Sequence, residues 1–251
     1  MNSSAASVTS GSLTGSGPVL NFKATPVTLV IGGLRTDSTF AGTFVESPEA
    51  VSIEKAGTGT LALTGENSYS GGTTVSEGTL RLGSNAAAGT GTITTTGSAI
   101  SHANCVVIAN AININTRQLQ VLKGETATQA GVIFETAGPR PLEKIGGGTL
   151  MLTCANTYNG VTTITAGTLQ IGDGGATGTI GSGNIVNNAV LNVNRSNIVT
   201  SGQIISGSGA VIQGGGAGFL ILSSVNTYSG GTILNNGTVS FAAATVVGPP
   251  R

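Results

Sequence analysis

Short segments in which apolar and polar residues alternate recur along the chain and predict β-strands. Leu61 and Leu63 flank Ala62, and Leu150 and Leu152 flank Met151. A period of two places every second side chain on the same face of a strand, so each segment has one face to bury. Gly, Asn and Ser stand at the ends of the segments and are typical of turns. No helical stripe of comparable length is present.

One stretch of sequence occurs three times, with copies near 53–83, 142–172 and 211–241. In sequence number, the second copy is offset from the first by 89, and the third from the second by 70. All three tyrosines of the chain occupy one position of this repeat. The repeat positions that we expect to have structural roles are Gly59, Leu61, Leu63, Asn67, Tyr69, Gly78, Leu80, Gly148, Leu150, Leu152, Asn156, Tyr158, Gly167, Leu169, Gly218, Leu220, Leu222, Asn226, Tyr228 and Gly237.

The spacing between strands within a copy predicts the architecture. The step from Leu61 to Leu80 is 19, and so is the step from Leu150 to Leu169. A constant step near 19, with glycine at the corners, favours an all-β parallel β-solenoid, in which each strand stacks on its equivalent one coil later. The chain length then gives about 11 to 13 coils and a rod of about 60 Å. We expect residues 1–39 to form N-terminal coils or a cap with a partial repeat, and 40–251 to continue as one solenoid.

The recurrent Asn and Tyr of the repeat are expected at corners. Asn tolerates left-handed backbone, and its amide can bond neighbouring backbone groups. The tyrosine ring is expected to pack over the corner with its hydroxyl at the surface. The alternatives are an asparagine that binds a ligand and tyrosines that stack on sugar rings.

Composition and charge restrict the partners. Only 8% of the 251 residues are charged, with ten charges of each sign, and Lys and Arg are scattered singly. Nucleic acid is therefore excluded as an expected partner. One histidine, His102, is too few for a metal site, and no cofactor motif is complete. Cys105 and Cys154 could form one disulfide, but we expect free, buried and inert thiols.

The unit K-x-G-x-G-T-L-x-L-T-G-x-N-x-Y-x-G-x-T-T-V-x-x-G-T-L-x-L-G carries a family resemblance. Lys55–Gly83 matches it closely, Lys144–Gly172 matches with Cys154 in place of one Gly, and Gly218–Phe241 matches more loosely. The unit resembles the autotransporter-associated β-strand repeat, also called the passenger-associated transport repeat, of bacterial type V secreted proteins.

The resemblance implies a right-handed, single-stranded parallel β-helix at the bacterial cell surface, associated with the outer membrane. It implies a structural or adhesive passenger segment whose repeats assist export and stack into a surface stalk. The implied partners are host or surface glycans or proteins, and a covalently continuous outer-membrane β-barrel in the full-length protein. This segment itself is not expected to insert into the membrane.

Both ends of the chain depart from such a passenger. A signal peptide begins with a basic region followed by an apolar run, whereas Met1–Ser4 is polar, so no signal peptide is expected. Val246–Arg251 lacks the alternating strands of a barrel. The expectation is a piece of a longer passenger or an incomplete gene product.

The alternative function is a carbohydrate-active parallel β-helix enzyme, either a polysaccharide lyase or a hydrolase. Such chemistry needs placed carboxylates, and the two aspartates, Asp37 and Asp173, stand in unrelated contexts. His102 is expected at a surface or corner. We therefore expect no catalytic residues. Residues 101–125 and 192–195 depart most from the repeat, and are either loops that face a partner or ordinary coils with degenerate sequence.

Overall fold

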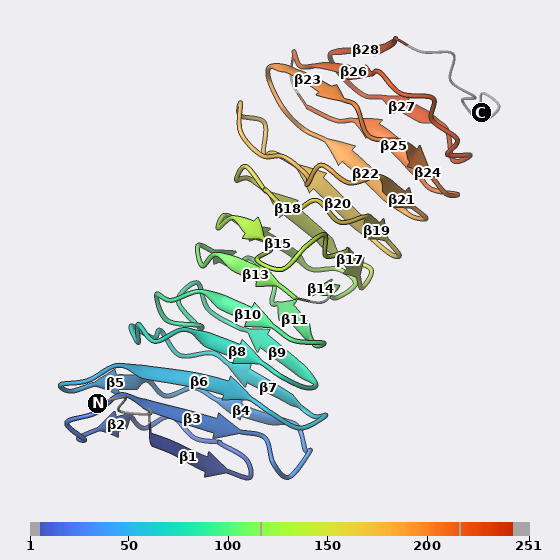
Figure 1. The fold of residues 1–251 in the computed structure, drawn as a ribbon. Helices are drawn as coiled ribbons and strands as arrows, with labels where there is room; N and C mark the ends of the chain where they lie inside the picture. The colour runs from blue at the N-terminus through green and yellow to red at the C-terminus, as the bar shows by residue number, and fades with distance from the viewer. Residues whose placement is uncertain (1–5, 116, 216, 243–251) are drawn as a thin grey trace.

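The chain winds into a stack of parallel coils (Figure 1). The computed structural model describes residues 6–115, 117–215 and 217–242, and in this part there are 28 strands and no helix. The coils number about 11. An all-β parallel solenoid is therefore confirmed. The outermost residues of the two expected segments, 1–5 and 243–251, lie outside the described residues, and so does the Val246–Arg251 stretch.

Each coil passes through up to three faces, and the paired strands on each face are parallel. The first face holds β1 (Ala6–Ser10), β3 (Val27–Ile31), β6 (Val51–Lys55), β8 (Thr73–Val75), β10 (Ile93–Thr95), β13 (Ile112–Ile114) and β16 (Ile133–Phe134). The second face holds β4 (Ser38–Phe40), β7 (Thr60–Leu63), β9 (Thr79–Leu82), β11 (Ala99–His102), β14 (Arg117–Val121), β17 (Leu142–Ile145), β19 (Thr162–Ile164), β21 (Ile185–Asn187) and β24 (Ile205–Ser206).

The third face is made of two sheets. It begins with β2 (Val19–Asn21) and β5 (Phe44–Glu46), and continues with β12 (Val107–Ile108), β15 (Thr126–Gln129), β18 (Thr149–Leu152), β20 (Thr168–Ile171), β22 (Val190–Val193), β25 (Ala210–Gln213) and β27 (Thr232–Leu234). Beyond β16, strands on the first face resume with β23 (Ile198–Ser201), β26 (Phe219–Leu222) and β28 (Thr238–Phe241).

The core is a set of aliphatic columns inside the stack. One column on the third face runs through residues paired in register, which are Ala127, Leu150, Leu169, Leu191 and Val211. All five are buried. Each of these side chains therefore has an apolar side chain of the adjacent coil directly above or below it.

Coil length is less constant than the sequence suggests. The predicted step of 19 joins Leu61 to Leu80, but the register pairs Gln118 with Glu143, a sequence separation of 25. Steps of 19 occur within the repeats and also outside them, as from Ile93 to Ile112, whereas the longer coils contain additional loop residues. A constant step along the whole rod is therefore wrong.

Each repeat stacks on itself. Its first two strands pair with its last two, as β6 with β8 and β7 with β9 in the first copy. The last strand of a repeat begins at a threonine that follows a glycine, and this glycine allows the two coils of the repeat to approach closely. Gly167 has a φ of +69°, and a Cβ there would lie 2.3 Å from the carbonyl oxygen of Gly148. Thr168 donates its backbone N–H to that same oxygen. One repeat thus closes one coil by its own residues.

Successive repeats begin on successive faces. The first copy starts with β6 on the first face, the second with β17 on the second face, and the third with β25 on the third face. The offset of 89 between the first two copies is four coils, from β6 through β8, β10 and β13 to β16, plus one further face. The offset of 70 is three coils, from β18 to β25, plus one face. Equivalent residues of different repeats are consequently not stacked.

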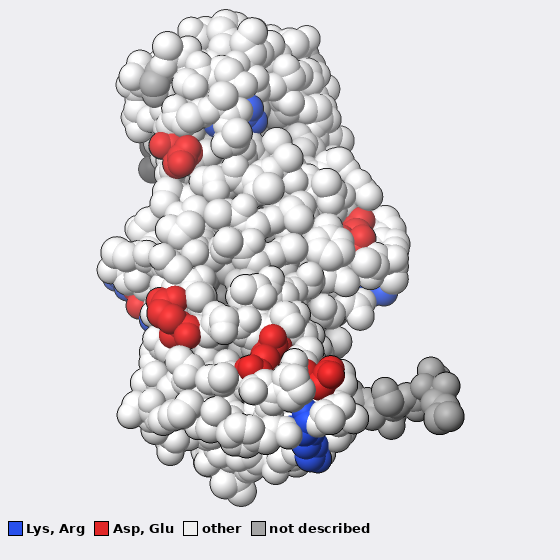
Figure 2. Space-filling view, turned by 90° about the vertical axis from the view of Figure 1, so that its left-hand side faces the viewer, with Lys and Arg blue, Asp and Glu red and all other residues white. Residues whose placement is uncertain are grey.

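The surface carries few charges. Figure 2 shows acidic and basic side chains as small separate spots on an otherwise uncharged face. An ion pair joins Arg81 and Glu125 at 2.6 Å. Within the same residue ranges, no helical segment has the length and apolar character needed to cross a bilayer.

Shortening a core leucine tests the column on the third face. Leu150→Ala removes a fully buried side chain between Ala127 and Leu169, and we expect it to lower the free energy of unfolding by about 2–5 kcal/mol. Met151→Ala, on the outward side of the same strand, is the control, with an expected loss of about 1 kcal/mol or less. Chemical denaturation followed by circular dichroism measures both. Equal losses would contradict the inward placement of Leu150.

Candidate functional site

The repeated asparagines bind backbone at the corners. The Oδ1 of Asn67 accepts the N–H of Phe44 in the preceding coil at 2.9 Å. Its Nδ2 donates to the carbonyl of Gly65 in its own coil and to that of Ala87 in the next coil. Asn156 and Asn226 likewise accept a backbone N–H from the coil before. The amide joins adjacent coils at the point where no strand ladder does so.

The repeated tyrosines are buried, so the expected exposure of their hydroxyls is wrong. Tyr69, Tyr158 and Tyr228 are at most 1% exposed. Each hydroxyl bonds the Oγ1 of the threonine four residues later, at 2.6 Å for Tyr69 and 2.9 Å for Tyr158. Burial raises the pKa of Tyr158 to about 12. Rings held in this way are not available to stack on sugars.

Two lysines of the repeat are also buried, a role that the sequence analysis missed. The Nζ of Lys144 donates to the carbonyls of Ile145, Gly146 and Ala166 at 2.8–3.1 Å. Lys55 makes the same three kinds of bond in the first repeat. Burial lowers the pKa of Lys144 to about 8. The lysine at the first position of the repeat unit is the sequence feature that could have predicted this buried role.

Corners without a lysine use an amide. Gln213 takes the position in the third repeat, and its Nε2 donates to the carbonyl of Gly215. Gln129, at the end of β15, donates to the carbonyls of Asn110 and Gly131. The corner therefore requires a hydrogen-bond donor directed at backbone carbonyls, and the charge is secondary.

His102 lies in the core, not at the surface or a corner as predicted. It is fully buried in register between Leu82 and Val121, and its Nε2 lies 3.2 Å from the Oε1 of Gln129. Burial lowers its pKa to about 4. The ring is neutral near pH 7, and no solvent reaches it.

The cysteines and aspartates have separate surroundings. Cys105 and Cys154 are free, as predicted, but Cys105 is exposed and Cys154 half-buried, so the expected burial is wrong. Asp37 accepts the backbone N–H of Thr60, and Asp173 accepts that of Gly175. The two aspartates lie on coils far apart in the stack. No three His, Cys, Asp or Glu side chains within the described ranges are placed to share a metal ion.

Of the two stretches that depart from the repeat, 101–125 forms ordinary coils. It contributes the end of β11 and the strands β12, β13 and β14 to the three sheets. The other stretch, 192–195, borders a cleft. The reading of 101–125 as a degenerate stretch of solenoid is therefore the one that the structure supports.

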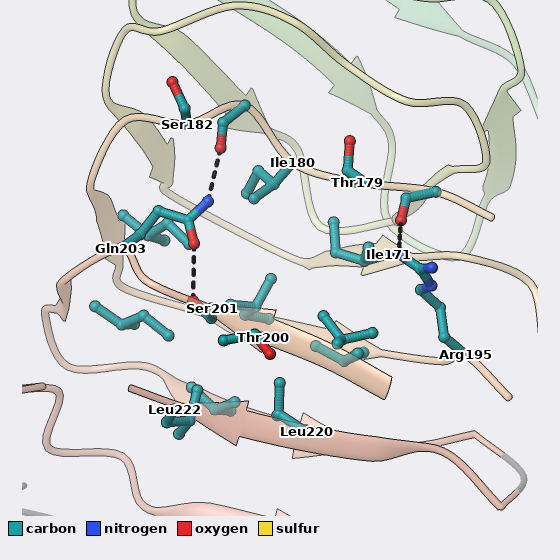
Figure 3. Close-up of a pocket in the computed structure, with 18 of the residues that line it drawn as sticks. Ile171, Thr179, Ile180, Ser182, Arg195, Thr200, Ser201, Gln203, Leu220 and Leu222 are labelled. Carbon is teal, nitrogen blue, oxygen red and sulfur yellow. Dashed lines mark hydrogen bonds between the residues drawn. The ribbon is translucent and has the colours of Figure 1, made fainter. Parts of the chain in front are cut away.

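The cleft opens where two successive coils of the first face do not pair (Figure 3). Residues 178–182 form one rim, and β23 forms the other as the edge strand of its three-stranded sheet. The cavity has a volume of about 400 Å³. Its floor consists of core side chains, which are Ile171, Leu191, Val193, Val211 and Leu220.

Two side chains bridge the rims in place of a strand ladder. Arg195 donates through Nη1 to the carbonyl of Gly178 and through Nη2 to that of Ala176, at 2.7 and 2.6 Å. Gln203 donates through Nε2 to the carbonyl of Gly181 at 2.7 Å (Figure 3). These bonds hold the two rims together at the two ends of the cleft.

The fold and the corners define a class of protein, a parallel β-solenoid built of repeats that stack on themselves. The family model of the passenger-associated transport repeat matches residues 53–82, 142–171 and 215–241. The chain thus carries three copies of the passenger-associated transport repeat, as the resemblance implied. It is also similar to the adhesin BmaC autotransporter of Brucella suis biovar 1 (strain 1330), with 38% identity over 150 residues. The aligned region is 57% of this chain and 4% of that adhesin. No solved structure matches.

Removing the tyrosine hydroxyl tests the buried corner. Tyr158→Phe leaves the Thr162 hydroxyl without its partner, and we expect a loss of about 1 kcal/mol in the free energy of unfolding. Thr162→Val alone should cost a similar amount. The double variant should cost less than the two losses added, because the same bond is removed once. Additive losses in the denaturation midpoints would contradict the bond.

The buried lysine makes stability depend on pH. Because the pKa of Lys144 is about 8 when folded and about 10.5 when unfolded, the unfolded chain binds more protons between these values. Stability is therefore expected to rise as the pH increases from about 8 towards 10. Lys144→Gln, which imitates Gln213, should keep a hydrogen-bond donor at the corner carbonyls and flatten this rise. Urea unfolding at pH 7.5 and 9.5 measures the difference, and an unchanged slope in the variant would exclude Lys144 as the source.

Proposed function

We propose that the chain is an adhesive passenger segment of an autotransporter, displayed at the cell surface and associated with the outer membrane. The observation that carries the proposal is its 38% identity over 150 residues to an adhesin autotransporter, together with the three transport repeats. The full-length protein would then include an outer-membrane translocation unit.

The outward rows of the sheets are suited to adhesion. On the first face the register aligns Glu54, Thr74, Thr94 and Asn113, all only partly buried. Short hydroxyl and amide side chains at the regular strand spacing can bond the hydroxyls of a glycan or the backbone of a protein. Contacts of this kind are individually weak, and a rod adds them along its length.

The self-stacking repeat supports a role in export. Because the last strands of a repeat pair with its own first strands, a segment as short as 142–171 can complete a coil without the next repeat. Coils that have emerged would become stable in order of emergence. The proposal is non-catalytic, and the use of Asp37 and Asp173 as acceptors for local backbone N–H groups supports it.

Adhesion is tested with beads that carry the purified chain. We expect these beads to bind cultured epithelial cells more than albumin-coated beads do. Retention in 0.5 M salt should stay within about twofold, since few charges take part. Thr74→Lys with Thr94→Lys alters only the outward row, and should reduce bead retention if the first face makes the contact. The matched control is Thr128→Lys with Gln170→Lys on the third face.

Native-chain beads that bind no better than albumin beads would contradict adhesion. Strong loss of binding in 0.5 M salt would contradict the uncharged mode of contact.

A further inference from the structure

The cleft is a break in one face of the solenoid. On the second face the ladder runs unbroken from β19 through β21 to β24, and on the third from β20 through β22 to β25. Only the first face lacks a ladder at this level, between 178–182 and β23. The break therefore opens the core to solvent without interrupting the stack.

The interior of the cleft is apolar. Leu191, Val193 and Val211 belong to strands of the third face, and Leu220 comes from the next coil of the first face. A cavity of about 400 Å³ falls in the range of small-molecule sites, and apolar cavities of this kind accept apolar ligands in place of water. The lining favours an aliphatic group.

Arg195 places a positive charge at one end of the cleft (Figure 3). Its Nε donates to Asn197, and its two terminal nitrogens each donate once to a backbone carbonyl. A guanidinium has five N–H donors, so two remain for another acceptor. Among the described residues, no ion pair involves Arg195, so no carboxylate compensates its charge.

The chemistry of the rims decides the occupant. An added peptide strand would need the carbonyls of Gly178 and Gly181, but these already accept from Arg195 and Gln203. A neutral apolar molecule would leave the guanidinium charge uncompensated. An aliphatic tail with one carboxylate satisfies both the apolar floor and the charge at its end.

We propose that this cleft binds a long-chain aliphatic carboxylate, with its tail against Leu191, Val193 and Val211 and its carboxylate on Arg195. Such a site goes beyond adhesion, and neither activity depends on the other. It would allow the stalk to take up free fatty acids at the cell surface.

Isothermal titration of the purified chain with dodecanoate, below its micelle concentration, tests the site. We expect one dodecanoate per chain. Dodecanol should bind at least tenfold more weakly, and dodecyltrimethylammonium should not bind. Absence of dodecanoate binding, or equal binding of the anionic and cationic probes, would overturn the proposal.

Variants separate the head and tail contacts. Arg195→Gln should weaken dodecanoate binding at least tenfold and leave dodecanol unchanged, whereas Arg81→Gln, the matched loss of a guanidinium elsewhere, should change neither. Val193→Phe should fill the cavity and weaken both ligands. Arg195→Lys keeps the charge if Arg195→Gln fails to fold, and should stay within about threefold of the parent. A loss of dodecanoate binding with Arg81→Gln as large as with Arg195→Gln would overturn the site.

Discussion

The structure depends on parallel pairing between each coil and the next, in a register that places apolar residues above apolar residues. A single coil cannot bury its inward side chains by itself, since their upper and lower sides are covered only by the neighbouring coils. The column from Ala127 to Val211 shows the result, with every member buried and paired in register with a residue about one coil away. The repeat satisfies this constraint locally, because its two halves are each other's nearest coils.

Polar groups inside the stack follow from the same constraint. At corners the backbone leaves the ladder, and its carbonyls and N–H groups still need partners. Asn67 supplies both donor and acceptor from one amide, and Lys55 supplies three donors from one ammonium. Burial of an ammonium is unfavourable unless its hydrogen bonds are satisfied. Gln213 at the equivalent corner fills the same need without the charge.

Much of the fold could be predicted from the sequence, because alternation and the step of 19 are consequences of strand geometry and coil length. The same step predicts the register of the strands within a repeat, such as the pairing of Leu61 with Leu80. The positions of Tyr158 and His102 did not, because whether a polar side chain turns inward depends on partners such as Thr162 and Gln129 that only the folded coils bring close. The cleft was signalled only by the departure of 192–195 from the repeat. Its opening depends on side-chain bridges from Arg195 and Gln203 that replace a strand ladder.

Each repeat begins one face further around the rod than the repeat before it, so equivalent residues of the three copies follow a helical path about the long axis. Tyr69, Tyr158 and Tyr228 lie in the segments between the paired strands of the three repeats, and these segments fall on three different faces and in different coils. A repeat stacked directly on its copies would show its outer residues along one side only, and that side could turn away from an opposing surface. Because the copies begin on three different faces, the outer residues of one copy face an opposing surface whatever the rotation of the rod about its long axis.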